Sequence, residues 1–181
     1  MLIPDGDFRY EIRRAGELIA TEEESLAAGK IRGVRHPASG SNVYEVEAEL
    51  DPAALVCRLV VRYSRGPFVR NATYESSDDF LRGNVSAMGS RNNLTTKLGR
   101  YREVDADLVI FRALTIAHIR ARGQSRWTGR IAAIDVNTLV AATRVFTSIA
   151  AIRPVHRDCP RARICAIVSA RKMTRSASTS R

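Results

Sequence analysis

Among the residues that could do acid–base chemistry, His118 has the most suggestive setting, because it lies within an apolar segment. The other histidines, His36 and His156, lie beside a Pro/Ser/Gly-rich loop and in a basic segment. A general base needs a carboxylate to orient it, and Asp105 and Asp107 are the nearest acids in the sequence. A small enzyme using His118 is therefore one hypothesis. The simpler interpretation, which we favour, is a hydrogen-bonded histidine at the boundary of the core.

A second group of residues could bind a ligand without transforming it. Aromatic residues recur on successive predicted strands, and Arg70 shares the strand parity of Phe68 and Tyr74. An arginine inside a core costs free energy unless it is paired or hydrated, so the simpler interpretation places it at the rim. The functional interpretation is an apolar pocket with a few cations, suited to an amphipathic anion such as a lipid. The candidate ligand-binding residues are then Tyr10, Tyr44, Tyr63, Arg70, Tyr74, Arg112, His118 and Trp127.

The sequence contains no pattern typical of a metal or cofactor site. Zinc usually needs four ligands at tight spacing, and Cys57, Cys159 and Cys165 include no C-x2-C pair. Phosphate-binding loops, nucleophile elbows and dinucleotide fingerprints are also missing. We therefore predict no metal site and no cofactor, and the missing motifs weigh against an enzyme. The run Glu22-Glu23-Glu24 is interpreted as a solvated edge or loop.

The elements that must position these side chains are predicted to be strands, because apolar and polar residues alternate with a period of two. Residues 5–26 read as a hairpin around Ala15-Gly16. Further strands are predicted over residues 30–34, 44–50, 55–63, 68–75, 80–87, 93–101, 127–134 and 138–147. Short strands separated by turns are typical of meanders, sandwiches and barrels. We predict a mainly β fold with a curved antiparallel sheet, either a spiral β-roll or a half-open barrel, with at most one or two short helices.

Residues 105–121 fit two secondary structures. Asp105 could cap a helix that places Leu108, Phe111 and Leu114 on one face. The β-branched residues of the segment favour a strand, whereas its length favours a helix. Between these alternatives, a short helix or irregular crossover is the preferred prediction.

The positive charge is concentrated at the end of the chain. The formal net charge is +10, but residues 153–181 contain eight Lys or Arg and one acid, whereas the preceding residues are near balance. We predict a single antiparallel β domain over residues 1–150 and a basic tail over 151–181, either disordered or the product of an out-of-frame reading. Association with nucleic acid or an anionic surface through this tail is the alternative function, and nucleic acid is otherwise an improbable partner.

The location and assembly of the protein are only weakly constrained by its sequence. Residues 1–11 contain no apolar run typical of a secretory signal, and no apolar stretch approaches the roughly 18–20 residues of a transmembrane helix. We therefore expect a cytoplasmic protein. The oligomeric state is left open.

The later part of the chain is similar to a bacterial spiral β-roll family described as glycolipid-binding. The likeness rests on an aspartate-led segment beginning at Asp105, a turn containing Gly123, and two strands separated by an acidic turn at Asp135. It extends over about residues 5–147 through the succession of strands and turns. The resemblance implies a β-roll with a ligand-holding concavity and no reaction. Our expectation is non-catalytic binding of a lipid-like small molecule in the concave face of the sheet.

Overall fold

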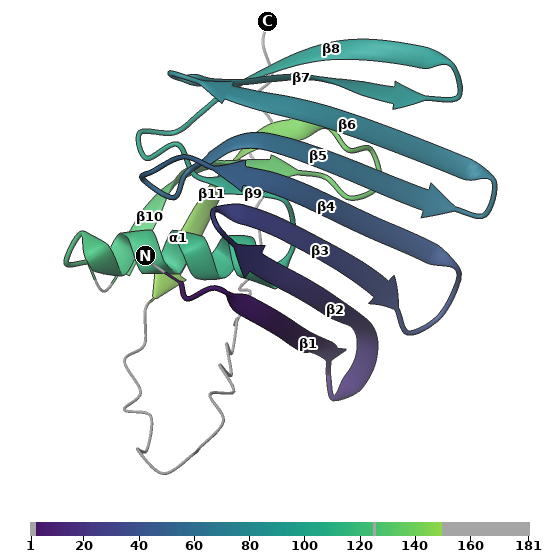
Figure 1. The fold of residues 1–181 in the computed structure, drawn as a ribbon, viewed down its shortest axis with the longest axis horizontal. Helices are drawn as coiled ribbons and strands as arrows, with labels where there is room; N and C mark the ends of the chain where they lie inside the picture. The colour runs from purple at the N-terminus through teal and green to yellow at the C-terminus, as the bar shows by residue number, and fades with distance from the viewer. Residues whose placement is uncertain (1–2, 125, 150–181) are drawn as a thin grey trace, which may run out of the picture. The chain divides into compact units, whose positions relative to one another are not determined.

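Eight consecutive strands form one antiparallel sheet in the computed structural model, which describes residues 3–124 and 126–149 (Figure 1). Each strand pairs with the one before it, so the sheet is a continuous meander. The strands are β1 (Gly6–Arg14), β2 (Glu17–Ala27), β3 (Lys30–Pro37), β4 (Asn42–Leu50), β5 (Val56–Arg65), β6 (Phe68–Ser77), β7 (Phe80–Ala87) and β8 (Ser90–Lys97). The predicted mainly β fold with a curved antiparallel sheet is confirmed, and the sheet does not close into a barrel.

Tight turns explain why successive strands pair with each other. In Ala15-Gly16, Ala28-Gly29 and Met88-Gly89, both residues have positive φ. A two-residue turn with this geometry matches the right-handed twist of its flanking strands, and therefore closes a hairpin. The predicted hairpin over residues 5–26 is present as β1 and β2, with cross-strand pairs from Gly6–Leu26 to Arg14–Glu17.

The rest of the described chain covers one face of this sheet (Figure 1). It contains β9 (Val104–Asp105), α1 (Val109–Ala121), β10 (Arg126–Ile134) and β11 (Ala141–Ile149). β10 pairs antiparallel with β11 and parallel with β9, which makes a second sheet of three strands. The preferred prediction of a short helix within residues 105–121 agrees with α1. No helix among the described residues is long and apolar enough to cross a membrane.

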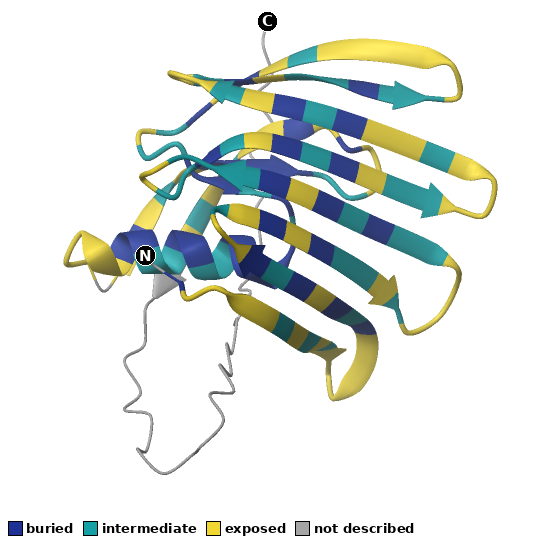
Figure 2. Ribbon diagram, in the orientation of Figure 1, coloured by how far each residue is buried: buried dark blue, intermediate teal, exposed yellow. Residues whose placement is uncertain are grey.

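The core lies between the large sheet and these covering elements. Buried residues alternate with exposed or half-buried ones along the central strands (Figure 2), as the period-two pattern predicts. The buried apolar side chains of β2 to β7 form one cluster with those of α1, β10 and the segments between them. Fully buried members include Ile31, Leu59, Leu81, Leu108 and Leu139. The face of the large sheet that carries the covering elements is thus occupied by the protein's own side chains.

Several strand boundaries differ from the sequence-based prediction; the strand expected over residues 138–147, for example, is β11 (Ala141–Ile149). The strand expected over residues 93–101 begins earlier and ends at Lys97, and the chain then makes a turn in which the Arg102 amide donates to the Gly99 carbonyl oxygen. Gly99 lies so close to β10 that a Cβ there would be 2.0 Å from the Arg130 carbonyl oxygen. This backbone contact draws the chain away from the large sheet. The predictions for residues 151–181 lie outside the described residues.

Candidate functional site

Two of the predicted ligand-binding tyrosines fix the covering elements to the large sheet. Tyr44 on β4 is 2% exposed, and its hydroxyl donates to the Ala106 carbonyl oxygen at 2.7 Å. Tyr74 on β6 is fully buried and donates to the Leu139 carbonyl oxygen at 2.6 Å, while accepting from the Ala141 amide at 3.2 Å. Burial raises the pKa of both phenols. These hydroxyl groups satisfy backbone partners inside the core and do not line an open cavity.

The remaining predicted residues on the large sheet lie on the edge strand β1 and on the interior strands β5 and β6. Tyr63 is half-buried and packs against the core, and Tyr10 stacks on Phe8 near the first edge with ring centroids 6.4 Å apart. Arg70 is exposed, and its guanidinium donates to the carbonyl oxygen of Asn137. This contact lies at the rim of the sheet, which agrees with the simpler interpretation that Arg70 does not point into the core. Tyr63 is paired directly with Arg70 across β5 and β6 and with Tyr44 across β4 and β5, whereas Tyr10 lies apart from them on β1.

The acidic run on β2 is the clearest departure from the sequence-based interpretation. Glu22 is fully buried and Glu24 is 3% exposed, so the prediction of a solvated edge or loop is wrong for both. Their carboxylates accept hydrogen bonds from the first amides of α1, at 3.0 Å to Val109 and 3.1 Å to Ile110. These amides have no partner within a helix, and the N-terminus carries partial positive charge. Two glutamates distant in sequence therefore cap the helix, and Asp105 does not.

The proximity of the two glutamates changes the acidity of Glu24. Burial, the charge of Glu22 and a hydrogen bond to Glu22 raise the pKa of Glu24 to about 8. At neutral pH, Glu24 therefore holds a proton that it donates to Glu22. Burial, Glu24 and Glu22 also raise the pKa of Tyr10 to about 12. The pair thus carries one negative charge rather than two.

Ion pairs surround this buried charge and account for Arg112. Arg35 on β3 contacts the Glu22 carboxylate at 2.6 Å and the Asp107 carboxylate at 2.7 Å. Arg112 on α1 pairs with Asp107 and lies 3.5 Å from the Asp105 carboxylate. Burial raises the pKa of Asp105, in opposition to the effect of Arg112. Arg112 is thus part of a network that joins α1 to the large sheet, and its guanidinium already has carboxylate partners.

His118 lies beside a carboxylate, but in a closed environment. Its Nδ1 is 3.1 Å from the Glu103 carboxylate and its Nε2 is 3.3 Å from the Ala53 carbonyl oxygen. His118 is 6% exposed and Glu103 4% exposed. Thr115 donates to the same carboxylate at 3.4 Å. Both ring nitrogens therefore have protein partners, which is the arrangement of a hydrogen-bonded core histidine. The acid beside it is Glu103, not Asp105 or Asp107.

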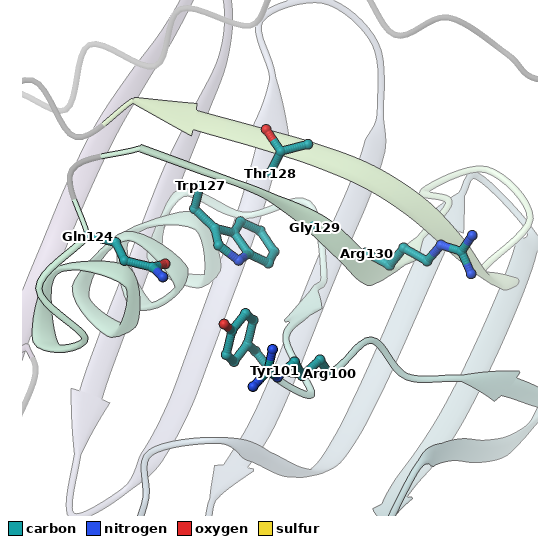
Figure 3. A pocket seen from close by; sticks show the side chains of 7 residues that line it. All are labelled: Arg100, Tyr101, Gln124, Trp127, Thr128, Gly129 and Arg130. Carbon is teal, nitrogen blue, oxygen red and sulfur yellow. The ribbon is translucent and has the colours of Figure 1, made fainter.

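Trp127 lies in a different environment from the other predicted residues, because it borders an open cleft of about 370 Å³. We call this the Trp127 cleft; it is lined by Arg100, Tyr101, Gln124, Trp127, Thr128, Gly129 and Arg130 (Figure 3). The rings of Tyr101 and Trp127 pack against each other at its base, with centroids 5.9 Å apart and planes inclined by 60°, and Trp127 is 6% exposed. Phe146 packs on Trp127 from β11 at 6.1 Å.

The backbone around the cleft fixes the position of its indole ring. A Cβ at Gly129 would lie 2.0 Å from Cζ2 of Trp127, so the ring occupies space that a side chain would fill. On the facing segment, the turn at Gly99 brings Arg100 and Tyr101 against β10. The two glycines thus allow the close approach that creates the cleft. A glycine two residues after a tryptophan on a predicted strand was the signal in the sequence that could have indicated this site.

The cleft is rich in positive charge. The Arg122 guanidinium lies 4.1 Å from the centroid of the Tyr101 ring, and that of Arg100 lies 5.6 Å from it. Arg122 also lies 3.5 Å from the Glu103 carboxylate, which offsets its charge. Among the described residues, no carboxylate forms an ion pair with Arg100 or Arg130. Figure 3 shows the Arg130 side chain extending away from the two rings.

No group of three or more histidine, cysteine, aspartate or glutamate side chains suited to a metal ion occurs in residues 3–124 and 126–149. The chain matches no protein-family model, no curated protein and no solved structure. The resemblance to the spiral β-roll family therefore stays a prediction. The geometry of the chain itself is the basis for any functional proposal.

Proposed function

We propose that the protein binds a small amphipathic anion without transforming it, and that the Trp127 cleft is the binding site. The observation that carries this proposal is the combination of two aromatic rings, Tyr101 and Trp127, with arginines that lack a carboxylate partner among the described residues. The volume of about 370 Å³ is at the lower end of the range for small-molecule sites. A ligand with a short apolar body and one anionic group fits these properties.

Each part of such a ligand has a matching group in the cleft. An apolar or aromatic body would cover the half-buried ring of Tyr101 and the 6% of Trp127 that is exposed. A carboxylate, sulfate or phosphate would accept paired hydrogen bonds from the guanidinium of Arg100, and Arg130, which extends away from the rings, would add positive charge at the margin. Gln124 and Thr128 add hydrogen-bonding groups at the margin. A cationic ligand of the same shape would be repelled by the same arginines.

The cleft is a better candidate than the covered face of the large sheet. On that face, α1 and the small sheet pack directly on the strands, and the predicted residues Tyr44 and Tyr74 donate to backbone carbonyls. Ligand entry there would require separating these layers. The cleft is open at the surface, so a ligand could reach it without separating these layers. We therefore keep the expectation of non-catalytic binding, but we propose that the binding site is the Trp127 cleft rather than the concave face of the large sheet.

The single tryptophan of the chain makes a direct test possible. Purified full-length protein is titrated with decanoate while tryptophan emission is recorded, and decyltrimethylammonium, of equal chain length and opposite charge, serves as the ligand control. We expect saturable quenching with decanoate only. The double variant Arg100→Gln/Arg130→Gln should weaken decanoate binding by about tenfold or more, since charged hydrogen bonds contribute roughly 1.5–3 kcal/mol each.

A matched variant separates the cleft from general surface charge. Arg65→Gln removes an exposed arginine at the end of β5, on the large sheet, and should leave the affinity unchanged. Equal responses to decanoate and decyltrimethylammonium would show that the cleft binds the alkyl chain through apolar contacts and does not select for a negative charge. An equal loss of affinity in the Arg65 variant would show that the anion is attracted by net charge alone. Either result would contradict the proposal.

A further inference from the structure

Strand β1 is an edge of the large sheet that has only one hydrogen-bonded neighbour among the described residues, namely β2 (Figure 1). Every second residue of such a strand directs its amide and carbonyl groups away from the sheet. These groups can pair with another strand. The opposite edge is partly covered, because the Thr143 hydroxyl on β11 donates to the Lys97 carbonyl oxygen of β8 at 3.1 Å.

Strand β1 has few of the features that usually prevent another strand from pairing with an exposed sheet edge. The strand has nine residues and contains neither proline nor lysine, and its pairing with β2 is regular from Gly6 to Ile12. The irregularity falls between Ile12 and Arg13, near its end. A long edge strand that is regular over most of its length and lacks proline and lysine is a site where a further strand can add, and its charged side chains limit which strand that is.

The outer face of β1 is complementary in charge to a second copy of itself. Asp7, Arg9, Glu11 and Arg13 alternate in sign on the outer face, while Phe8, Tyr10 and Ile12 face the covered side. When two such strands pair antiparallel about an axis at Tyr10, Asp7 faces Arg13 of the second copy and Arg9 faces Glu11. On the other face, Phe8 meets Ile12 and the two tyrosines meet each other. Opposite charges directly across a strand pair stabilise it.

We propose that two copies of this chain associate through their β1 strands, antiparallel and about a two-fold axis at Tyr10. Neighbouring registers do not share this complementarity. An axis at Arg9 opposes two Arg9 side chains and sets Asp7 against Glu11, and an axis at Glu11 opposes Arg9 and Arg13. Like charges directly across a strand pair are unfavourable. Axes at Phe8 or Ile12 give two opposite-charge pairs, whereas the axis at Tyr10 gives four. The charge order therefore favours the Tyr10 register, and the partner it fits is an identical strand.

This association is independent of the Trp127 cleft. The contact is small, so we expect a dimer that forms with rising protein concentration rather than an obligate one. It would also extend the half-buried row of Phe8, Tyr10 and Ile12 across the axis. These side chains would then lose their remaining exposure to water.

Charge reversal and its rescue test the register. Sedimentation velocity is measured on the full-length chain between about 5 and about 500 µM, a range that brackets a weak dimer. We expect wild type to dimerise, and both Arg9→Glu and Glu11→Arg to weaken association by about tenfold or more, because each places like charges opposite each other twice per dimer. The double variant Arg9→Glu/Glu11→Arg restores opposite charges and should recover wild-type association.

Arg62→Glu is the matched control. Arg62 lies on the same outer face but inside the sheet, 3.7 Å from Glu45, just as Arg9 lies 3.8 Å from Glu23. The Arg62→Glu variant should dimerise like wild type. A protein that stays monomeric over the whole range overturns the proposal. A dimer that is insensitive to both single variants, or a double variant that stays as weak as they are, overturns it as well.

Discussion

Replacing Glu24 by glutamine should remove a pH dependence that the buried glutamate pair imposes on stability. The pKa of Glu24 is raised from 4.5 to about 8 in the folded protein, mainly by burial and secondarily by Glu22. The folded state therefore binds this proton more tightly than the unfolded state does. The contribution is fully present below about pH 4.5 and is lost as pH rises towards about 8. A glutamine amide keeps the neutral hydrogen-bonding form at every pH.

The size of the effect follows from the shift in pKa. Each pKa unit corresponds to about 1.4 kcal/mol of folding free energy. The contribution of Glu24 to stability therefore falls by on the order of 5 kcal/mol between pH 4.5 and pH 8. A typical domain is stabilised by roughly 5–15 kcal/mol, so even half of this change would be a large part of the total free energy of unfolding. At about pH 5, Glu24→Gln should be close to wild type. By about pH 8.5 the variant should be the more stable protein by several kcal/mol.

Urea denaturation at intervals from about pH 5 to about pH 8.5, followed by the emission of Trp127, measures this difference. Glu23→Gln is the control, because Glu23 lies between the pair on the same strand and its side chain is 60% exposed. It should give a curve parallel to that of wild type. If the curves for Glu24→Gln and wild type also stay parallel over this range, the two glutamates do not share a proton and the reasoning fails.

Three further predictions concern other contacts. Glu22→Gln removes the β2 carboxylate that pairs with half-buried Arg35, which keeps Asp107, and should lower the free energy of unfolding by about 1–3 kcal/mol in urea at pH 7, whereas Glu24→Gln should not lower it. Tyr74→Phe removes two buried hydrogen bonds and should cost about 1–3 kcal/mol in the same assay. Gly129→Ala places a methyl group where the Trp127 indole lies, so a shift of the emission maximum and loss of decanoate quenching are expected in fluorescence titrations.

The sequence was sufficient to predict the meander because its signals are local. Alternation on residues 44–50 and turn pairs such as Ala15-Gly16 depend only on neighbours in the chain, and β4 and the first hairpin appear where expected. The end of β8 was misplaced because its cause is not local. The backbone contact between Gly99 and Arg130 joins residues that are far apart in sequence, and no periodicity reports it.

The candidate site was harder to predict for the same reason. Trp127 was recognised as a ligand-binding candidate, but its neighbours in the cleft, Arg100 and Tyr101, come from a segment expected to continue a strand. The acidic residues on β2 looked solvated, because a single sequence does not show that a helix N-terminus lies above them. Tyr44 was predicted to bind a ligand, but its hydroxyl donates to the Ala106 carbonyl oxygen, and this contact depends on a segment that packs back onto the sheet.

The indole N–H of Trp127 offers the most direct measurement of the central claim, since the chain contains no other tryptophan and one cross-peak reports on the cleft. In ¹H–¹⁵N correlation spectra of full-length protein, decanoate should shift this peak progressively to saturation, and decyltrimethylammonium should leave it in place. The Arg100→Gln/Arg130→Gln variant should need about tenfold more decanoate for the same shift. An indole peak that does not move while decanoate shifts other resonances would place the anion elsewhere and contradict the assignment of the Trp127 cleft.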